Sequence, residues 1–180
     1  RQDYFRVKNL LVDLLQNSEE DTEIREVALK ALSGLGFQQF VREWINDFFT
    51  SDKKSSRIIA VLAMGKYPHF WEEELAALIM PDTDKILLME AISACYSSES
   101  ELLASKIVKV LEMADADADV MVYALYTLAN INRTENLGEL LQKYSLHSER
   151  RVREAARKAI DLFSQKNFDD FLHNDLGYEE

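Results

Sequence analysis

Apolar residues recur along the chain at the spacing of one face of an α-helix. The pattern runs through residues 3–17, 38–49, 69–80, 100–114 and 134–146. Within 100–114, for example, it places Leu103, Ile107, Val110 and Leu111 on the same side. Positions i, i+3, i+4 and i+7 share one helix face, so each segment has a side that must be buried. The pattern therefore predicts five amphipathic helices.

Between these segments lies a second pattern that returns five times. The phrase "EIREVALKALSGL" at 23–35 reappears as "RVREAARKAIDLF" at 151–163, and looser copies occupy 56–67, 84–95 and 120–131. Alignment of the copies gives the anchors Ala28, Ala60, Leu88, Ala124 and Ala156, separated by 32, 28, 36 and 32 residues. A period in this range is typical of arrays of repeated helix pairs.

One column of this alignment contains small residues. Three positions after each anchor stand Ala31, Ala63, Ala91, Thr127 and Ala159, and a large apolar residue follows each of them. A small side chain next to a large one on a helix face lets two helices approach closely and interlock, and the anchor column at i shares the face of the column at i+3. The second helices are therefore predicted to pack against one another.

Short polar joints separate the predicted helices and carry Ser, Thr, Asp or Asn where an N-cap is needed. The chain thus divides into five helix pairs and a C-terminal segment. The pairs span 1–36, 37–67, 68–96, 97–131 and 132–164, and 165–180 is predicted to form a partial helix or cap with a tail.

The pattern of a polar turn, Val/Ile-Arg, two residues, Ala, two residues and Ala-Leu resembles the second helix of a HEAT repeat. The first and fifth copies carry it well, and the middle three match loosely. The resemblance implies an all-α fold, a right-handed α-α superhelix of the armadillo type, in which second helices line a concave face that binds partners. A tetratricopeptide array has a similar period but requires Trp, Gly-Tyr and Pro signatures that do not occur here.

Composition narrows the range of partners. The formal net charge of -11 is a poor match for phosphates, so nucleic acid and anionic membranes are not expected as main partners. No apolar run reaches the roughly 18 residues that a membrane span needs. A single cysteine, Cys95, fits a reducing compartment and favours the cytoplasm. Because the chain begins at Arg1, we expect it to be a piece of a longer protein.

No pattern of catalytic, metal-ligating or cofactor-binding residues is found. The histidines His69, His147 and His173 lie in different units and lack ligand spacing. Cys95 stands in a core column, where a free cysteine behaves as a small hydrophobe. The stretch "DADAD" at 115–119 lacks the Gly and Glu of a calcium loop, so Asp117 or Asp119 is predicted to cap the next helix. We therefore predict no catalytic residue, metal or cofactor.

The predicted concave face is a stripe on the second helices, two positions before, two after and five after each anchor. Its central residues are largely apolar and its outer ones polar. The candidate partner-binding residues are Ile58, Leu62, Ile86, Val122 and Tyr126, with Glu26, Lys30, Glu90 and Lys158 for polar specificity. An exposed apolar strip of this size indicates a binding site. The alternative is that curvature of the array buries the strip.

A basic cluster near the C-terminus is conspicuous in an acidic chain. Arg150, Arg151 and Arg157 could meet an acidic partner, or they could form a solvated helix face. Arg153 belongs to a repeating Arg/Lys column that we expect to hydrogen-bond between neighbouring repeats.

These observations favour a non-catalytic scaffold or adaptor that holds a protein or peptide in the concave groove. Two alternatives stay open. The chain also resembles, at repeat level, HEAT-like enzymes such as phycobilin lyases and alkylated-base DNA glycosylases, of which a glycosylase would need a basic groove. It could also be a regulatory segment that packs on a neighbouring domain of a larger protein.

Overall fold

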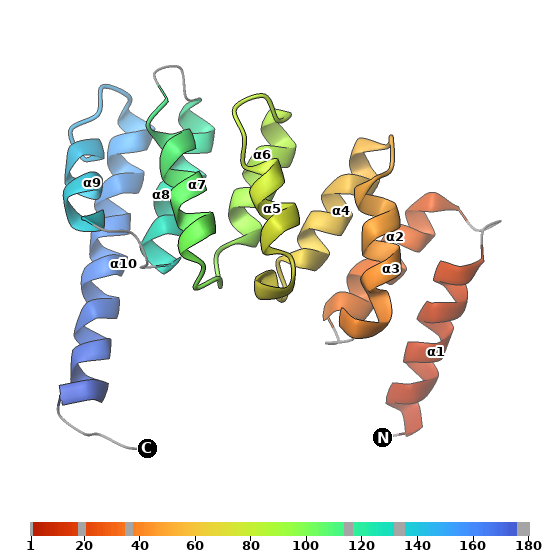
Figure 1. The fold of residues 1–180 in the computed structure, drawn as a ribbon. Helices are drawn as coiled ribbons and strands as arrows, with labels where there is room; N and C mark the ends of the chain where they lie inside the picture. The colour runs from red at the N-terminus through yellow and green to blue at the C-terminus, as the bar shows by residue number, and fades with distance from the viewer. Residues whose placement is uncertain (1, 18–20, 35–37, 114–116, 132–135, 176–180) are drawn as a thin grey trace.

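The computed structural model describes residues 2–17, 21–34, 38–113, 117–131 and 136–175 (Figure 1). Within these residues the chain forms ten α-helices, one short 3-10 helix and no strand, which confirms the all-α prediction. The elements are α1 (Gln2–Gln16), α2 (Thr22–Gly34), α3 (Gln38–Phe49), α4 (Lys54–Met64), η1 (Pro68–Phe70), α5 (Glu72–Leu78), α6 (Lys85–Ala94), α7 (Glu101–Leu111), α8 (Ala118–Ile131), α9 (Leu137–Tyr144) and α10 (Arg150–Asp175).

The helices follow one another as pairs placed side by side, from α1 at one end of the molecule to α9 and α10 at the other (Figure 1). Each odd-numbered helix packs against the even-numbered helix that follows it. The even-numbered helices also pack in succession, α2 on α4, α4 on α6, α6 on α8 and α8 on α10. We call this series the even-helix row. Among neighbouring odd-numbered helices of the described residues, α5 and α7 pack against each other, and the other pairs make few contacts.

The small-residue column lies inside the row, as its spacing predicts. Ala63, Ala91, Thr127 and Ala159 are buried, and Ala31 in the first pair is half-buried. The large apolar residue after each of these is buried or packs against the core, as in Met64 and Ile92. Because a small side chain allows the close approach that its large neighbour then fills, this column holds successive pairs together.

Polar side chains begin several helices, as predicted. The Asp84 carboxylate accepts hydrogen bonds from the backbone N–H groups of Ile86 and Leu87, at 3.0 and 3.2 Å. The Asp117 carboxylate accepts one from the Asp119 N–H at 2.8 Å, at the start of α8. These bonds satisfy N–H groups that have no partner within the helix. Asp117 is therefore a capping residue; Asp115 lies outside the described residues.

Helix α10 differs in length from the helices before it. It continues without a break from Arg150 to Asp175, so residues 165–175 extend the second helix of the fifth pair. The side chain of His173 and the residues after Asp175 lie outside the described part of the chain.

A candidate interaction surface on the even-helix row

The residues predicted to contact a partner all lie on the even-numbered helices. They are the residues of the face that the helical spacing predicts. We call it the even-helix face. Glu26 and Lys30 lie on α2, Ile58 and Leu62 on α4, Ile86 and Glu90 on α6, Val122 and Tyr126 on α8, and Lys158 on α10.

The apolar centre of this face is neither fully exposed nor fully buried. Ile86 leaves 50% of its surface accessible to solvent. Ile58, Leu62, Val122 and Tyr126 are half-buried, and all of these but Leu62 are among the partly buried residues that pack against the core. The strip therefore supplies core contacts and retains surface for an external contact.

The polar residues at the edges of the face have different roles. Lys30 and Lys158 are exposed and Glu90 is half-buried. Glu26 is buried, and its carboxylate accepts hydrogen bonds from the hydroxyl groups of Ser55 at 3.0 Å and Ser56 at 2.8 Å. Because Ser55 and Ser56 belong to α4, the Glu26 carboxylate joins two successive helices of the row.

A series of ion pairs runs along the N-terminal ends of the even helices, and the sequence patterns did not predict it. The Lys54 ammonium contacts the Asp84 carboxylate at 2.7 Å. The Lys85 ammonium contacts Asp117 at 2.9 Å and Asp119 at 2.8 Å. Each lysine is in the first turn of its helix and reaches acids at the start of the next even helix. The partners are 30 to 34 residues apart in the sequence. This separation matches the repeat period, so the spacing of the charged residues could have indicated the ion pairs.

These pairs shift the titration of the groups involved. The hydrogen bond from Lys54 lowers the pKa of Asp84, and the hydrogen bond from Lys85 lowers the pKa values of Asp117 and Asp119. The same two aspartates, Asp119 first, raise the pKa of Lys85. All of these side chains are open to solvent, where screening makes the contribution of an ion pair to stability small. The same arrangement occurs at two successive steps of the row, from α4 to α6 and from α6 to α8.

The predicted basic patch is largely engaged within the chain. The Arg151 guanidinium contacts the Asp119 carboxylate at 2.6 Å, which extends the ion-pair series from α8 to α10. Arg150 pairs with Glu154 one turn further along α10, at 2.7 Å, and Arg157 is exposed.

The Arg/Lys column was predicted to hydrogen-bond between neighbouring repeats, and it does so at Lys85 but not through the bonds of Arg25 and Arg153. Arg153 donates hydrogen bonds to the carbonyl oxygens of His147 and Ser148, in the turn before its own helix. Arg25 donates to the Leu15 carbonyl of its own pair. Both guanidinium groups therefore donate to backbone carbonyl oxygens of the segment before their own helix. These hydrogen bonds stabilise the connection between the two helices of one pair. Lys85 is the member of the column that contacts the following repeat.

Two features of the described side chains bear on metal binding and on the reactivity of cysteine. No cluster of three or more His, Cys, Asp or Glu residues able to hold a metal ion occurs among them. Cys95 is buried, and this burial raises the pKa of its thiol to about 12. Because the thiolate is the nucleophile, a thiol that stays protonated at neutral pH is inert.

Within the described residues, no helix combines the length and the apolar character needed to cross a bilayer. A scan against protein-family models and a search of curated proteins both find no match to this chain.

Proposed function

We propose that the chain is a right-handed HEAT-like superhelix of five repeats, and that it binds a protein or peptide along the even-helix face without catalysing a reaction. The repeat period, the buried small-residue column and the succession of even helices support the repeat assignment. In such an array each pair contacts only its neighbours, which leaves an extended surface for a partner.

The observation that carries the binding proposal is the position of Ile86. It lies on α6, the middle helix of the even-helix row, and half of its surface is exposed. Leu62 on α4 and Tyr126 on α8 occupy the flanking helices and are half-buried. A large, half-exposed apolar side chain on the middle helix of the row, with partly accessible apolar residues on the helices beside it, is a candidate interface anchor.

The polar residues of the face would then set specificity. Lys30 and Lys158 lie on α2 and α10, the end helices of the row, and are exposed; Glu90 lies near the centre. A partner with acidic groups toward its ends and an apolar middle would match this distribution. Glu26 would remain in its hydrogen bonds with α4, and its part in binding would be to hold α2 in position.

The test compares two similarly exposed apolar residues, one on an even-numbered helix and one on an odd-numbered helix. Ile86→Glu places a charge in the first turn of α6, the middle helix of the even-helix row. Leu102→Glu places the same charge on α7, where Leu102 is 47% exposed and Ile86 is 50% exposed. Proteins captured from the native host by the unmodified chain would be identified by mass spectrometry and compared with those captured by each variant.

We expect a defined set of proteins to be lost with Ile86→Glu and retained with Leu102→Glu, while circular dichroism shows both variants folded. Equal retention by both variants would overturn the proposal, because it would place binding elsewhere.

A further inference from the structure

The carboxylate of Glu90 has no partner in the part of the chain that the structure describes. Glu90 lies on α6 and is half-buried, and no described residue makes a hydrogen bond or an ion pair with its side chain. Lys85, the other charged residue of α6, contacts Asp117 at 2.9 Å and Asp119 at 2.8 Å. Glu90 is therefore a partly covered charge that the described fold leaves unpaired.

The side of α6 that carries Glu90 is otherwise uncharged. Ile86 is exposed, and Met89 and Ser93 are half-buried. Positions 86, 89, 90 and 93 follow the i, i+3, i+4 and i+7 spacing of one helix face. The buried residues of α6, which lie on its other sides, are Leu87, Leu88, Ala91, Ile92 and Ala94.

The helices on either side of α6 also carry partly accessible apolar residues. Leu62 on α4 and Tyr126 on α8 are half-buried and stand two residues after their repeat anchors, as Glu90 does on α6. The helices α4, α6 and α8 pack in succession, and α5 and α7 lie in front of α6 and α8 in Figure 1. Because α5 covers one side of α6, the accessible residues of α6 lie away from α5.

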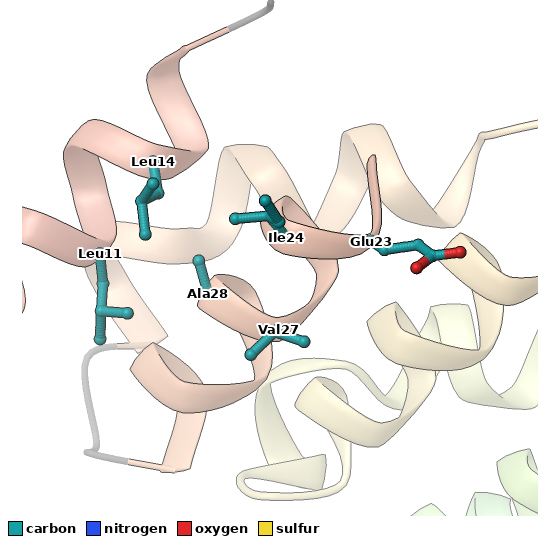
Figure 2. A pocket seen from close by; sticks show the side chains of 6 residues that line it. All are labelled: Leu11, Leu14, Glu23, Ile24, Val27 and Ala28. Atoms are coloured by element: carbon teal, nitrogen blue, oxygen red, sulfur yellow. The ribbon is translucent and has the colours of Figure 1, made fainter. Parts of the chain in front are cut away.

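A second apolar surface, on the first helix pair, differs in its charge. Glu23 is the charged residue of its lining, and in Figure 2 the Glu23 carboxylate points away from the apolar side chains. A peptide that covered those side chains would leave this carboxylate in water, so the surface does not select for a basic partner. The apolar residues that line this cavity of about 320 Å³ are Leu11, Leu14, Ile24, Val27 and Ala28.

An apolar partner that covered the even-helix face would exclude water from the Glu90 carboxylate. Removing an unpaired charge from water is costly, so such a partner would bind weakly. A Lys ammonium or Arg guanidinium placed against Glu90 would replace the lost hydration by a charge-assisted hydrogen bond. An Arg guanidinium can also stack on a tyrosine ring, and Tyr126 lies on the neighbouring helix. The formal net charge of -11 attracts a cationic segment as well.

From the unpaired carboxylate and the apolar residues beside it, we propose that the even-helix face recognises a peptide segment with one Arg or Lys flanked by apolar residues. The basic side chain pairs with Glu90, and the apolar side chains cover Ile86 and the accessible apolar residues of α4 and α8. This inference rests on the proposed binding at the even-helix face, and it adds the chemistry of the partner.

The experiment selects peptides without knowledge of the natural partner. A phage-displayed library of random linear peptides is selected against the chain, and the selected peptides are synthesised with a fluorescent label. Their affinities are measured by fluorescence anisotropy for the unmodified chain, Ile86→Glu and Val27→Glu. Peptides that lose affinity with Ile86→Glu and keep it with Val27→Glu are assigned to the even-helix face, because Val27→Glu places a charge in the cavity of the first pair.

We expect the assigned peptides to share an Arg or Lys between apolar residues. Glu90→Gln keeps the shape of the side chain and removes its charge, and it should weaken binding by roughly tenfold or more because the charge pair is lost. Glu73→Gln, at an exposed position of α5, removes the same charge and should change the affinity by less than about twofold. Glu90→Lys should reject the assigned peptides and bind versions in which Glu replaces the Arg or Lys. Circular dichroism should show every variant folded.

Three results would overturn this inference. If the assigned peptides carry no basic residue, or bind Glu90→Gln as tightly as the unmodified chain, the pairing with Glu90 is wrong while binding at the even-helix face stands. If no selected peptide loses affinity with Ile86→Glu, both the pairing and the proposed function fail. A dimer of the unmodified chain in sedimentation, dissociated by Ile86→Glu, would show instead that a second copy covers the face.

Discussion

Gly65, at the end of α4, lies against the backbone of Ala94, at the end of α6. A Cβ atom at position 65 would be 2.9 Å from the Ala94 Cα and 3.0 Å from its Cβ. The φ angle of Gly65 is -64°, an ordinary helical value, so its backbone conformation does not require glycine. Glycine is required at this position because α4 and α6 come so close together that a methyl group would not fit.

Gly65→Ala should therefore destabilise the protein by about 1 to 3 kcal/mol, the usual cost of overpacking a close contact. Urea denaturation would measure the change. Gly34→Ala is the matched control, because at the end of α2 a Cβ atom would meet nothing within 4 Å. There alanine should be neutral or stabilise by up to about 1 kcal/mol through its higher helix propensity. Equal effects of the two substitutions would contradict the close contact.

Ser56→Ala tests the link between the first two helix pairs. The Ser56 hydroxyl donates to the buried Glu26 carboxylate at 2.8 Å. Loss of a hydrogen bond to a buried charged group typically costs about 1.5 to 3 kcal/mol. Urea denaturation should show this loss, whereas Ser105→Ala at an exposed position of α7 should change the unfolding free energy by less than about 0.5 kcal/mol. A neutral Ser56→Ala would contradict a stabilising role for this hydrogen bond between α2 and α4.

The Lys85 ion pairs predict a pH dependence with a definite sign. Because hydrogen bonds from Lys85 lower the pKa values of Asp117 and Asp119 below 3.8, their contribution to stability is complete above about pH 4. It is lost as the pH falls through the lowered values. Carbon-detected NMR titration of the carboxyl groups should show both pKa values rising in Lys85→Gln.

Lys109→Gln, on the exposed side of α7, removes the same charge away from the ion-pair series and serves as the control. It should leave the two aspartate titrations where they are. A shift of equal size in both variants would indicate a general effect of net charge, and would remove the argument for specific pairing.

Cys95 should be unreactive in the folded protein. Its thiol is buried and its pKa is raised to about 12, so the thiolate is scarce at pH 8. We expect alkylation by iodoacetamide to be slow in buffer and fast in urea. Ser97→Cys, at an exposed position two residues away, should react quickly in buffer and shows that the reagent is active. Fast labelling of Cys95 in buffer would point to an opening of α6 that the structure does not show.

The helices could be predicted from the sequence because a helix that buries one face needs apolar residues at i, i+3, i+4 and i+7. This spacing can be recognised within a single short segment. The small-residue column was also readable: Ala63 and Ala91 are buried as their spacing requires. The length of α10 was not, since no breaker such as Gly or Pro stands at the boundary predicted between residues 164 and 165, and the helix continues to Asp175. Local patterns show where a helix is favoured and say less about where it ends.

The candidate surface was harder to predict because helical spacing alone does not give the rotation of one helix against the next. Glu26 shares the stripe of Lys30, yet it is buried against Ser56 while Lys30 is exposed. The pairing of Lys85 with Asp117 also depends on how far α8 is displaced along α6. The period of the charged residues could have revealed it, because the partners are one repeat apart.

The unequal packing of the two helix rows has a mechanical consequence. The even helices touch in an unbroken succession, whereas most neighbouring odd helices in the described residues do not pack closely. Bending that spreads the odd helices breaks few contacts, and bending that separates the even helices breaks many. The molecule should therefore bend easily in the direction that spreads the odd helices and resist bending in the opposite direction. A force that pulls its two ends apart is carried mainly by the contacts within the even-helix row.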